Sequence, residues 1–138
     1  MHKKKIIIAI LIIGIIGVFV AYKMYNKPHI NVADSKSDLT LTADKIINDF
    51  SSDESKANTI YLERIISVSG EIYELNVEKG KGIITLKTKD DFGSVLCHLS
   101  DESTKKMGSQ KVGQTISVKG ICTGYLLDVI LVKCEITN

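Results

Sequence analysis

Residues 66–77, which read ISVSGEIYELNV, decide the fold. Apolar residues and one glycine occupy every second position over Ile66–Ile72, and the alternation resumes over Tyr73–Val77 after a shift of one residue. A period of two predicts a β-strand, and a one-residue shift within it predicts a β-bulge, with Gly70 permitting a sharp bend. A long strand that bends can serve both sheets of a small barrel.

The rest of the chain supplies the other elements of such a barrel. A helix is expected over 42–58, with Thr42 as N-cap and an interruption at Ser51-Ser52. Alternation and turn residues predict further strands at 84–88, 95–99, 116–122 and 129–136, and helical turns at 101–107. This order predicts a mainly β, five-stranded OB-fold Greek-key barrel with an N-terminal helix. An SH3-like barrel would lack the helix between the third and fourth strands.

A segment of another kind precedes the barrel. The run Ile6 to Tyr22 contains 15 apolar residues and two glycines, and it carries no charge. As a helix it spans about 25 Å, so we expect residues 1–25 to form a single transmembrane signal-anchor. The lysines at 3–5 predict a cytoplasmic N-terminus and a periplasmic or extracellular C-terminal domain. A cleaved signal peptide is the alternative, although Phe19 stands where cleavage requires a small residue.

Composition separates these two parts of the chain. The 138 residues are 44% hydrophobic and carry a formal charge of +2. Four of the 18 lysines and arginines lie before residue 26, which leaves 14 basic against 16 acidic residues after it. This balance argues against a strongly basic nucleic-acid binder, and the single apolar run excludes a multi-span channel. We expect the polar residues 26–40 to be a flexible linker and residues 41–138 to form the OB-fold domain.

Several short fragments of the later part resemble the tRNA_anti-like family of OB-fold domains. They are Asp53-Glu54, Ala57-Asn58, Tyr61, VSGEI at 68–72, VGQ at 112–114, VKGICTGY at 118–125, DVIL at 128–131 and Cys134. The resemblance covers roughly residues 41–137. It implies a small bacterial OB-fold domain that is exported or anchored in a membrane. Most members of this family have no assigned function. The family name implies likeness to anticodon-binding domains in fold, and it does not imply binding of tRNA.

The ligand face of an OB-fold lies on its second and third strands, between two loops. The matching positions are Lys79, Lys81, Lys87, Lys89 and His98, with Tyr125 in the last loop. Lysines can contact phosphates and Tyr125 can stack on a base; the alternatives are a solvated strand face and a plug at the barrel end. The neighbouring Asp90-Asp91 and the scarcity of candidate exposed aromatics (Tyr73, Phe92 and Tyr125) oppose binding of nucleic acid.

All three cysteines, Cys97, Cys122 and Cys134, fall on the predicted core face. They are either three small buried hydrophobic residues or one disulfide with a free thiol. The pairing of such a disulfide stays open, although a bond between Cys97 and Cys134 is compatible with the expected strand order. Cys97 and His98 are adjacent and point to opposite faces, and no C-x-x-C or H-x-x-x-H spacing occurs. The sequence therefore predicts no metal and no cofactor.

The sequence shows no nucleophile paired with a base and no general acid paired with a general base. We therefore expect a protein without enzymatic activity. The expected function is a non-enzymatic, membrane-tethered OB-fold binding module outside the cytoplasm. Its partners would be the lipid bilayer, through the N-terminal helix, and a protein, peptide or envelope ligand. A single-stranded oligonucleotide-binding OB domain is the alternative, and an immunity-type accessory protein is a third.

Overall fold

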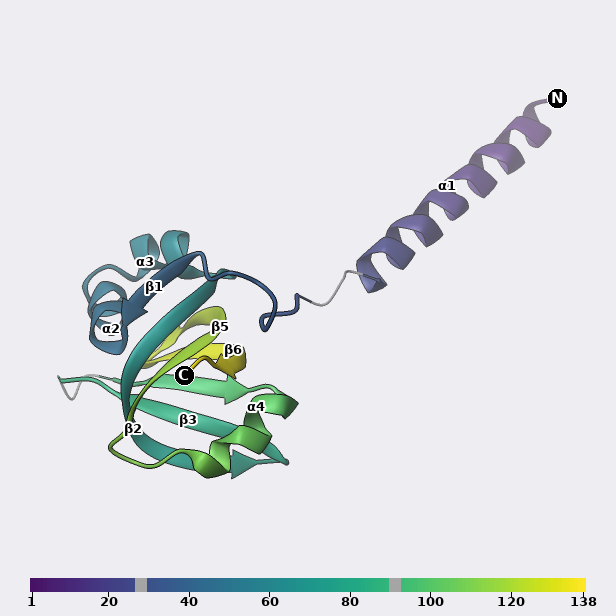
Figure 1. The fold of residues 1–138 in the computed structure, drawn as a ribbon. Helices are drawn as coiled ribbons and strands as arrows, with labels where there is room; N and C mark the ends of the chain where they lie inside the picture. Colours follow the sequence, from purple (N-terminus) through teal and green to yellow (C-terminus); the bar gives the residue numbers. More distant parts are fainter. Residues whose placement is uncertain (27–29, 90–92) are drawn as a thin grey trace. The chain divides into compact units, whose positions relative to one another are not determined.

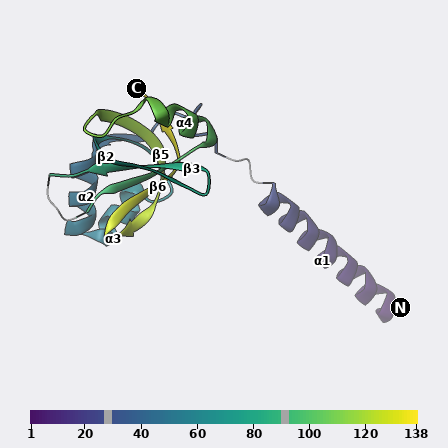
Figure 2. The ribbon, with the colours of Figure 1, turned by 90° about the horizontal axis from the view of Figure 1, so that it is seen from below.

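The structure, a computed structural model, describes residues 1–26, 30–89 and 93–138. It divides into two compact units, Met1–Ile30 and Asn31–Asn138. The first unit contains a single helix, and the second is mainly β-structure with short helices on its surface (Figures 1 and 2). The second unit is the expected barrel domain.

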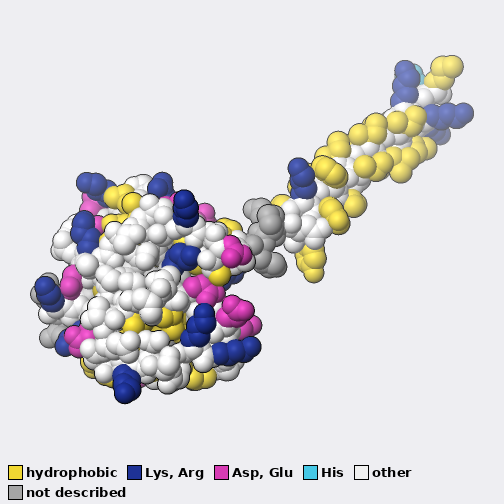
Figure 3. All heavy atoms as spheres, in the orientation of Figure 1, with side chains coloured by type: hydrophobic (Ala, Val, Ile, Leu, Met, Phe, Trp, Pro, Cys, Tyr) yellow, Lys and Arg dark blue, Asp and Glu magenta, His cyan; other side chains and the backbone are white. Residues whose placement is uncertain are grey.

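The helix of the first unit, α1, runs from His2 to Tyr25. At 1.5 Å per residue its 24 residues span about 36 Å. An 18-residue window within it reaches a mean hydropathy of 2.7, and none of its residues is buried. Apolar side chains cover its length, and lysines gather near its N-terminal end (Figure 3). α1 contains the predicted run Ile6 to Tyr22, and it is long and apolar enough to cross a bilayer.

Five strands of the second unit close into a barrel. They are β2 (Ile65–Glu78), β3 (Lys81–Lys87), β4 (Val95–Leu99), β5 (Thr115–Leu126) and β6 (Asp128–Ile136). β2 pairs antiparallel with β5 along its N-terminal half and with β3 along its C-terminal half, while β4 pairs parallel with β6. The sheet order β1-β2-β3-β4-β6-β5, with β5 returning to β2, confirms the predicted OB-fold.

β2 bends at a β-bulge that coincides with the shift in the sequence pattern. Its register against β3 slips between Ile72 and Glu74, which leaves Tyr73 as the extra residue. At Gly70 a Cβ would lie 3.1 Å from the Cβ of Ala43, so the missing side chain lets the first residue of the neighbouring helix approach the strand. The predicted bulge is confirmed.

Two short helices, α2 (Ala43–Ser52) and α3 (Glu54–Tyr61), lie together on the barrel (Figure 1). Thr42 caps α2 and Asp53 caps α3, each by accepting a backbone N–H from the first turn of its helix. The predicted N-cap is confirmed, and the predicted interruption corresponds to the break at Asp53. α3 continues to Tyr61, three residues beyond the expected end of the helix at residue 58, and β2 starts four residues later.

The segment before α2 packs on the barrel, although the sequence placed residues 26–40 in a flexible linker. β1 (Leu39–Thr42) is a sixth strand and pairs parallel with β2. The Nζ of Lys119 on β5 donates to the carbonyl oxygens of Ala33 and Ser35 at 3.1 and 2.7 Å. Contacts with residues far along the chain therefore order a segment whose own composition resembles a linker.

The expected helical insert between β4 and β5 is present as α4 (Asp101–Lys106), which the single 3-10 turn Met107–Ser109 follows. The buried hydroxyl of Ser103 donates to Oε2 of Glu135 at 2.6 Å and accepts the backbone N–H of Ile136 at 3.0 Å. These bonds join α4 to β6. The insert that distinguishes the OB-fold from an SH3-like barrel is thus confirmed.

Close packing inside the barrel depends on Gly120. A Cβ at this position would lie 2.5 Å from Sγ of Cys134 and 3.2 Å from the carbonyl oxygen of Val132. The core around it consists mostly of aliphatic side chains and the three cysteines: Ile66, Val68, Ile72, Ile84, Leu86, Val95, Cys97, Leu99, Ile116, Val118, Cys122, Val129, Leu131 and Cys134. A rigid strand backbone on one side and a filled core on the other leave no room for a methyl group.

We predict that Gly120→Ala lowers the free energy of unfolding by about 1–3 kcal/mol, because the methyl group overpacks the core. Chemical denaturation of the full-length protein in detergent measures this change. Gly108→Ala is the matched control, since a Cβ there meets nothing within 4 Å. Its stability is expected to stay within about 0.5 kcal/mol of the native protein. Equal stability of the two variants would contradict the packing described here.

Candidate ligand-binding site

The outer face of β2, β3 and β4 carries the candidate site. Ile84 and Leu86 on β3 are fully buried, so Thr85 between them lies on the opposite, outer face. Thr85 pairs with Leu96 on β4 and with Glu74 on β2. These three residues form a row across the sheet, which is the floor of the site.

A groove of about 390 Å³, here named the Tyr73 groove, opens over this row. The bulge takes Tyr73 out of the strand ladder, and its side chain is 63% exposed. At the β6 side, Oδ1 of Asp128 accepts hydrogen bonds from the backbone N–H and the hydroxyl of Ser94 at 2.8 and 2.9 Å. The lining residues are Tyr73, Glu74, Thr85, Lys87, Thr88, Gly93, Ser94, Leu96 and Asp128.

A second groove of about 450 Å³, here named the Asp44 groove, adjoins the first, because Lys87 and Thr88 line both. It includes the first residues of α2, where Oδ1 of Asp44 accepts the backbone N–H of Lys89 at 2.6 Å. This bond ties the chain after β3 to the helix. The lining residues are Thr42, Ala43, Asp44, Ser69, Gly70, Glu71, Lys87, Thr88, Lys89 and Thr115.

Carboxylates outnumber lysines in the described lining of the two grooves. The acidic residues are Asp44, Glu71, Glu74 and Asp128, and the basic residues are Lys87 and Lys89. Four carboxylates against two ammonium groups make the described lining net acidic. Hydroxyl groups of serine and threonine fill most of the remaining polar positions. The arrangement suits hydrogen bonding to a ligand and opposes the approach of a polyanion.

The structure brings together two of the four predicted lysines. Lys87 and Lys89 line the grooves, whereas Lys79 lies in the turn after β2 and Lys81 forms an exposed ion pair of 3.8 Å with Asp101. Lys81 and Lys87 begin and end β3, so about 20 Å separates them along the strand at 3.3 Å per residue. The lysines therefore do not form one basic patch.

His98 and Tyr125, the other predicted ligand residues, lie outside both grooves. His98 sits on β4 opposite Ile83. The ring of Tyr125 is half-buried and stacks on Phe50 of α2, with 5.3 Å between centroids and 20° between planes. One face of that ring is thus occupied by a core residue, as the plug interpretation expects.

Sequence reasoning missed Glu74, Ser94, Leu96 and Asp128 as lining residues. They come from three strands and a loop, and only the strand register brings them together. The available signal was the bulge, since an extra residue in a strand often re-aims a side chain beside a site. The predicted Asp90-Asp91 and Phe92 lie outside the described residues.

The cysteines are buried and carry free thiols. Burial raises the pKa of Cys134, and the hydrogen bond between its thiol and that of Cys97 adds to the rise. Burial also raises the pKa of Cys122. The thiols of Cys122 and Cys134 are therefore protonated and weakly reactive near neutral pH. Among the described residues, no group of three or more His, Cys, Asp or Glu side chains could hold a metal ion.

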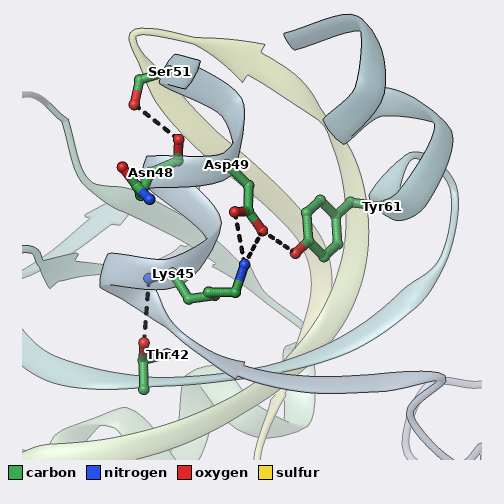
Figure 4. Close-up of polar contacts among 6 residues, drawn as sticks. All are labelled: Thr42, Lys45, Asn48, Asp49, Ser51 and Tyr61. Carbon is green, nitrogen blue, oxygen red and sulfur yellow. Dashed lines mark hydrogen bonds and ion pairs between the residues drawn. The ribbon is translucent and has the colours of Figure 1, made fainter. Parts of the chain in front are cut away.

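A polar cluster joins α2 to α3 and lines neither groove (Figure 4). Oδ2 of Asp49 accepts the hydroxyl of Tyr61 at 2.5 Å, and its two oxygens accept Nζ of Lys45 at 2.7 and 2.8 Å. Burial raises the pKa of Tyr61 to about 12, and the hydrogen bond to Asp49 contributes. Burial likewise raises the pKa of Asp49, but the bonds from Lys45 and Tyr61 outweigh it, and the net shift is downward. The cluster holds the two helices together.

The closed strands and the grooves over β2, β3 and β4 define an OB-fold domain with a ligand face. The chain belongs to the tRNA_anti-like family, whose model matches residues 1–136. This match confirms the resemblance seen in the sequence and extends it over α1. No curated protein sequence matches the chain.

Two solved structures share the fold at low sequence identity. A lipoprotein of Klebsiella pneumoniae, provisionally described as nucleic acid-binding, has a TM-score of 0.62 and 15% identity, with 81% of this chain and 100% of that chain covered. An aspartyl-tRNA synthetase of Leishmania major, also a provisional description, has a TM-score of 0.50 and 12% identity, with 87% and 25% covered. The chain thus spans a quarter of the synthetase. At these identities the likeness shows the fold alone.

We predict three titratable thiols per chain in denatured protein prepared without reductant, because all three cysteines are free. A colorimetric thiol count measures this number. A count of one would instead identify a disulfide, and peptide mapping would then show which two cysteines form it.

We predict that Tyr61→Phe lowers the free energy of unfolding by about 1–2 kcal/mol near neutral pH, because the Asp49 carboxylate loses a buried O–H donor. Tyr73→Phe, which removes an exposed hydroxyl, is the control and should change stability little. Denaturation as a function of pH is the measurement.

The loss of stability caused by Tyr61→Phe should be confined to a pH window. Asp49 has a lowered folded pKa, so its contribution is full above the ordinary pKa of 3.8 and is lost as pH falls through the folded pKa. Tyr61 has a raised folded pKa, so its contribution is full below 10.0 and is lost as pH rises toward about 12. A difference between the native protein and Tyr61→Phe that persists unchanged below the acid limit would contradict this coupling.

Proposed function

We propose that this chain is a non-enzymatic, membrane-anchored OB-fold binding module, with its barrel outside the cytoplasm and a ligand held in the Tyr73 and Asp44 grooves. The observation that carries the proposal is α1, whose 24 residues include a long run that is apolar on every side. A helix without a polar face is stable in water only if its surface is covered, and hydrocarbon provides that cover.

The distribution of lysines supports the orientation. Three lysines precede the apolar run at residues 3–5, and Lys23 alone follows it within α1. By the positive-inside rule this excess favours a cytoplasmic N-terminus, and the barrel then lies in the periplasm or outside the cell. The Klebsiella pneumoniae protein of similar fold is described as a lipoprotein, which accords with a membrane-attached OB-fold domain.

The chemistry of the grooves supports binding rather than catalysis. Asp128 is held by two hydrogen bonds from Ser94, and Asp44 accepts the backbone N–H of Lys89. The described lining contains no histidine or cysteine that would act as a general base or nucleophile near neutral pH. Carboxylates and hydroxyls fixed in this way can hold a ligand by hydrogen bonds.

A single-stranded oligonucleotide is the second candidate ligand. The description of the Klebsiella pneumoniae protein favours it, and Lys87 and Lys89 could contact phosphates. The four carboxylates of the lining oppose it, because they would lie close to the phosphates. Binders of this class also use several stacking rings, whereas the described lining has one aromatic residue, Tyr73.

We predict that alkaline phosphatase fused after Asn138 is active in cells and that green fluorescent protein in the same place is dark, because the barrel is exported. The unfused protein should stay in the membrane pellet after alkaline carbonate washing and keep its full-length mass.

The double variant Ile12→Lys and Ile15→Lys is the control. Each lysine at the centre of a spanning helix costs about 2.5–3.5 kcal/mol, so this variant should leave the membrane fraction. Reporter activity in the cytoplasm would refute the location, and a mature mass lacking the first ~20 residues would refute the anchor.

A further inference from the structure

We propose that the Tyr73 groove and the Asp44 groove together bind an uncharged oligosaccharide, with the ring of Tyr73 as its stacking platform. This rests on the proposed function, which makes the grooves a ligand site, and it assigns the chemical class of the ligand. Four features of the grooves carry the proposal: one exposed ring, the mixture of donors and acceptors, the acidic lining and the position on a closed sheet.

The exposed ring of Tyr73 is the first feature. The bulge removes Tyr73 from the β2–β3 ladder, and 63% of its side chain is exposed over the row of Glu74 and Thr85. An exposed aromatic ring at the side of a groove gives a ligand a flat surface on which to pack. The C–H face of a pyranose ring is flat and apolar, and it packs on an aromatic ring in the way other apolar groups do.

The polar lining is the second feature. Sugar hydroxyls both donate and accept, so their site needs donors and acceptors side by side. The Tyr73 groove supplies the ammonium of Lys87 as a donor and the carboxylates of Glu74 and Asp128 as acceptors. The hydroxyl of Thr85, a residue that is only 9% exposed, can do both at the floor of the groove. Within the part of the chain that the structure describes, the side chains of Glu74 and Lys87 have no hydrogen bond or ion pair, and both are therefore available to a ligand.

The acidic lining is the third feature, and it selects among polar ligands. Nucleic acids and anionic glycans would place negative groups beside Asp44, Glu71, Glu74 and Asp128, where like charges repel them. An uncharged glycan meets no such penalty. Because the two grooves adjoin at Lys87 and have volumes of about 390 and 450 Å³, they accommodate several sugar units in line.

The position on the sheet is the fourth feature, and it argues against an extended peptide. A peptide commonly gains affinity by adding a strand to an open sheet edge. The Tyr73 groove lies on the outer face of β2, β3 and β4, and the barrel strands pair with one another around the closed sheet. A ligand recognised through ring stacking and hydroxyl groups can bind on this face, because it does not need an unpaired strand edge.

The experiment uses the full-length protein in micelles of a zwitterionic detergent, because maltoside and glucoside detergents carry competing sugar head groups. Chitotetraose, cellotetraose and maltotetraose are titrated by calorimetry against the native protein and its variants. We expect at least one of them to bind with a sub-millimolar Kd. Tyr73→Ala should weaken that binding about tenfold, and Glu74→Gln should weaken it less.

Two control variants separate the ring from other effects. Tyr73→Phe keeps the ring, and Val77→Ala changes a residue of β2 that is 56% exposed and lines neither groove. Val77→Ala should bind the sugar within about twofold of the native protein, and Tyr73→Phe should bind it more tightly than Tyr73→Ala does. Equal binding by Tyr73→Ala and the native protein, with both folded by circular dichroism, would overturn the assignment of Tyr73. Failure of all three sugars to bind would overturn the ligand class.

An oligothymidine and an oligolysine peptide are titrated in parallel. If either binds and Tyr73→Ala abolishes that binding, the grooves remain a ligand site and the sugar assignment is wrong. If neither they nor the sugars bind, the ligand site of the proposed function fails as well. The anchor and its orientation are tested independently by the reporter fusions, so the two proposals can fail separately.

Discussion

The pairing of β2 with three other strands is the constraint on which the rest of the domain depends. Its fourteen residues pair with β1 and β5 in the first half and with β3 in the second half. A strand that belongs to both halves of a closed sheet must bend, and the extra residue Tyr73 marks the bulge in β2. The same bulge brings Tyr73 to the lining of the Tyr73 groove. Barrel closure and the candidate site therefore have one structural cause.

The charge of the site distinguishes this domain from what its family name suggests. The whole chain is slightly basic, but four lysines belong to the N-terminal helix, and the described groove lining is acidic. In the proposed function, charge has two separate roles along the chain: lysines around the apolar helix would orient a membrane segment, and carboxylates on the barrel would select the ligand. Likeness of fold to nucleic-acid-binding domains consequently says little about the ligand here.

Periodicity was sufficient to predict most of the fold. The alternation around residues 66–77 predicted the long strand and its bulge, and Thr42 predicted the start of the first barrel helix. The sequence did not reveal β1, because four residues are too few for a pattern and Lys119 orders the preceding segment from a distant strand. The site was less predictable for the same reason. Strand register places Leu96 and Asp128 beside Tyr73, and local sequence does not encode register.

The three buried cysteines make the barrel its own reporter of internal motion. Each thiol is fully shielded, so an alkylating reagent reaches it only when the strands around it separate. Cys97 lies on β4, Cys122 on β5 and Cys134 on β6. The rate of alkylation at each position, read by mass spectrometry, would therefore measure how often each strand opens in the native full-length protein. A ligand that stabilises the closed barrel would slow all three rates without any label having been introduced.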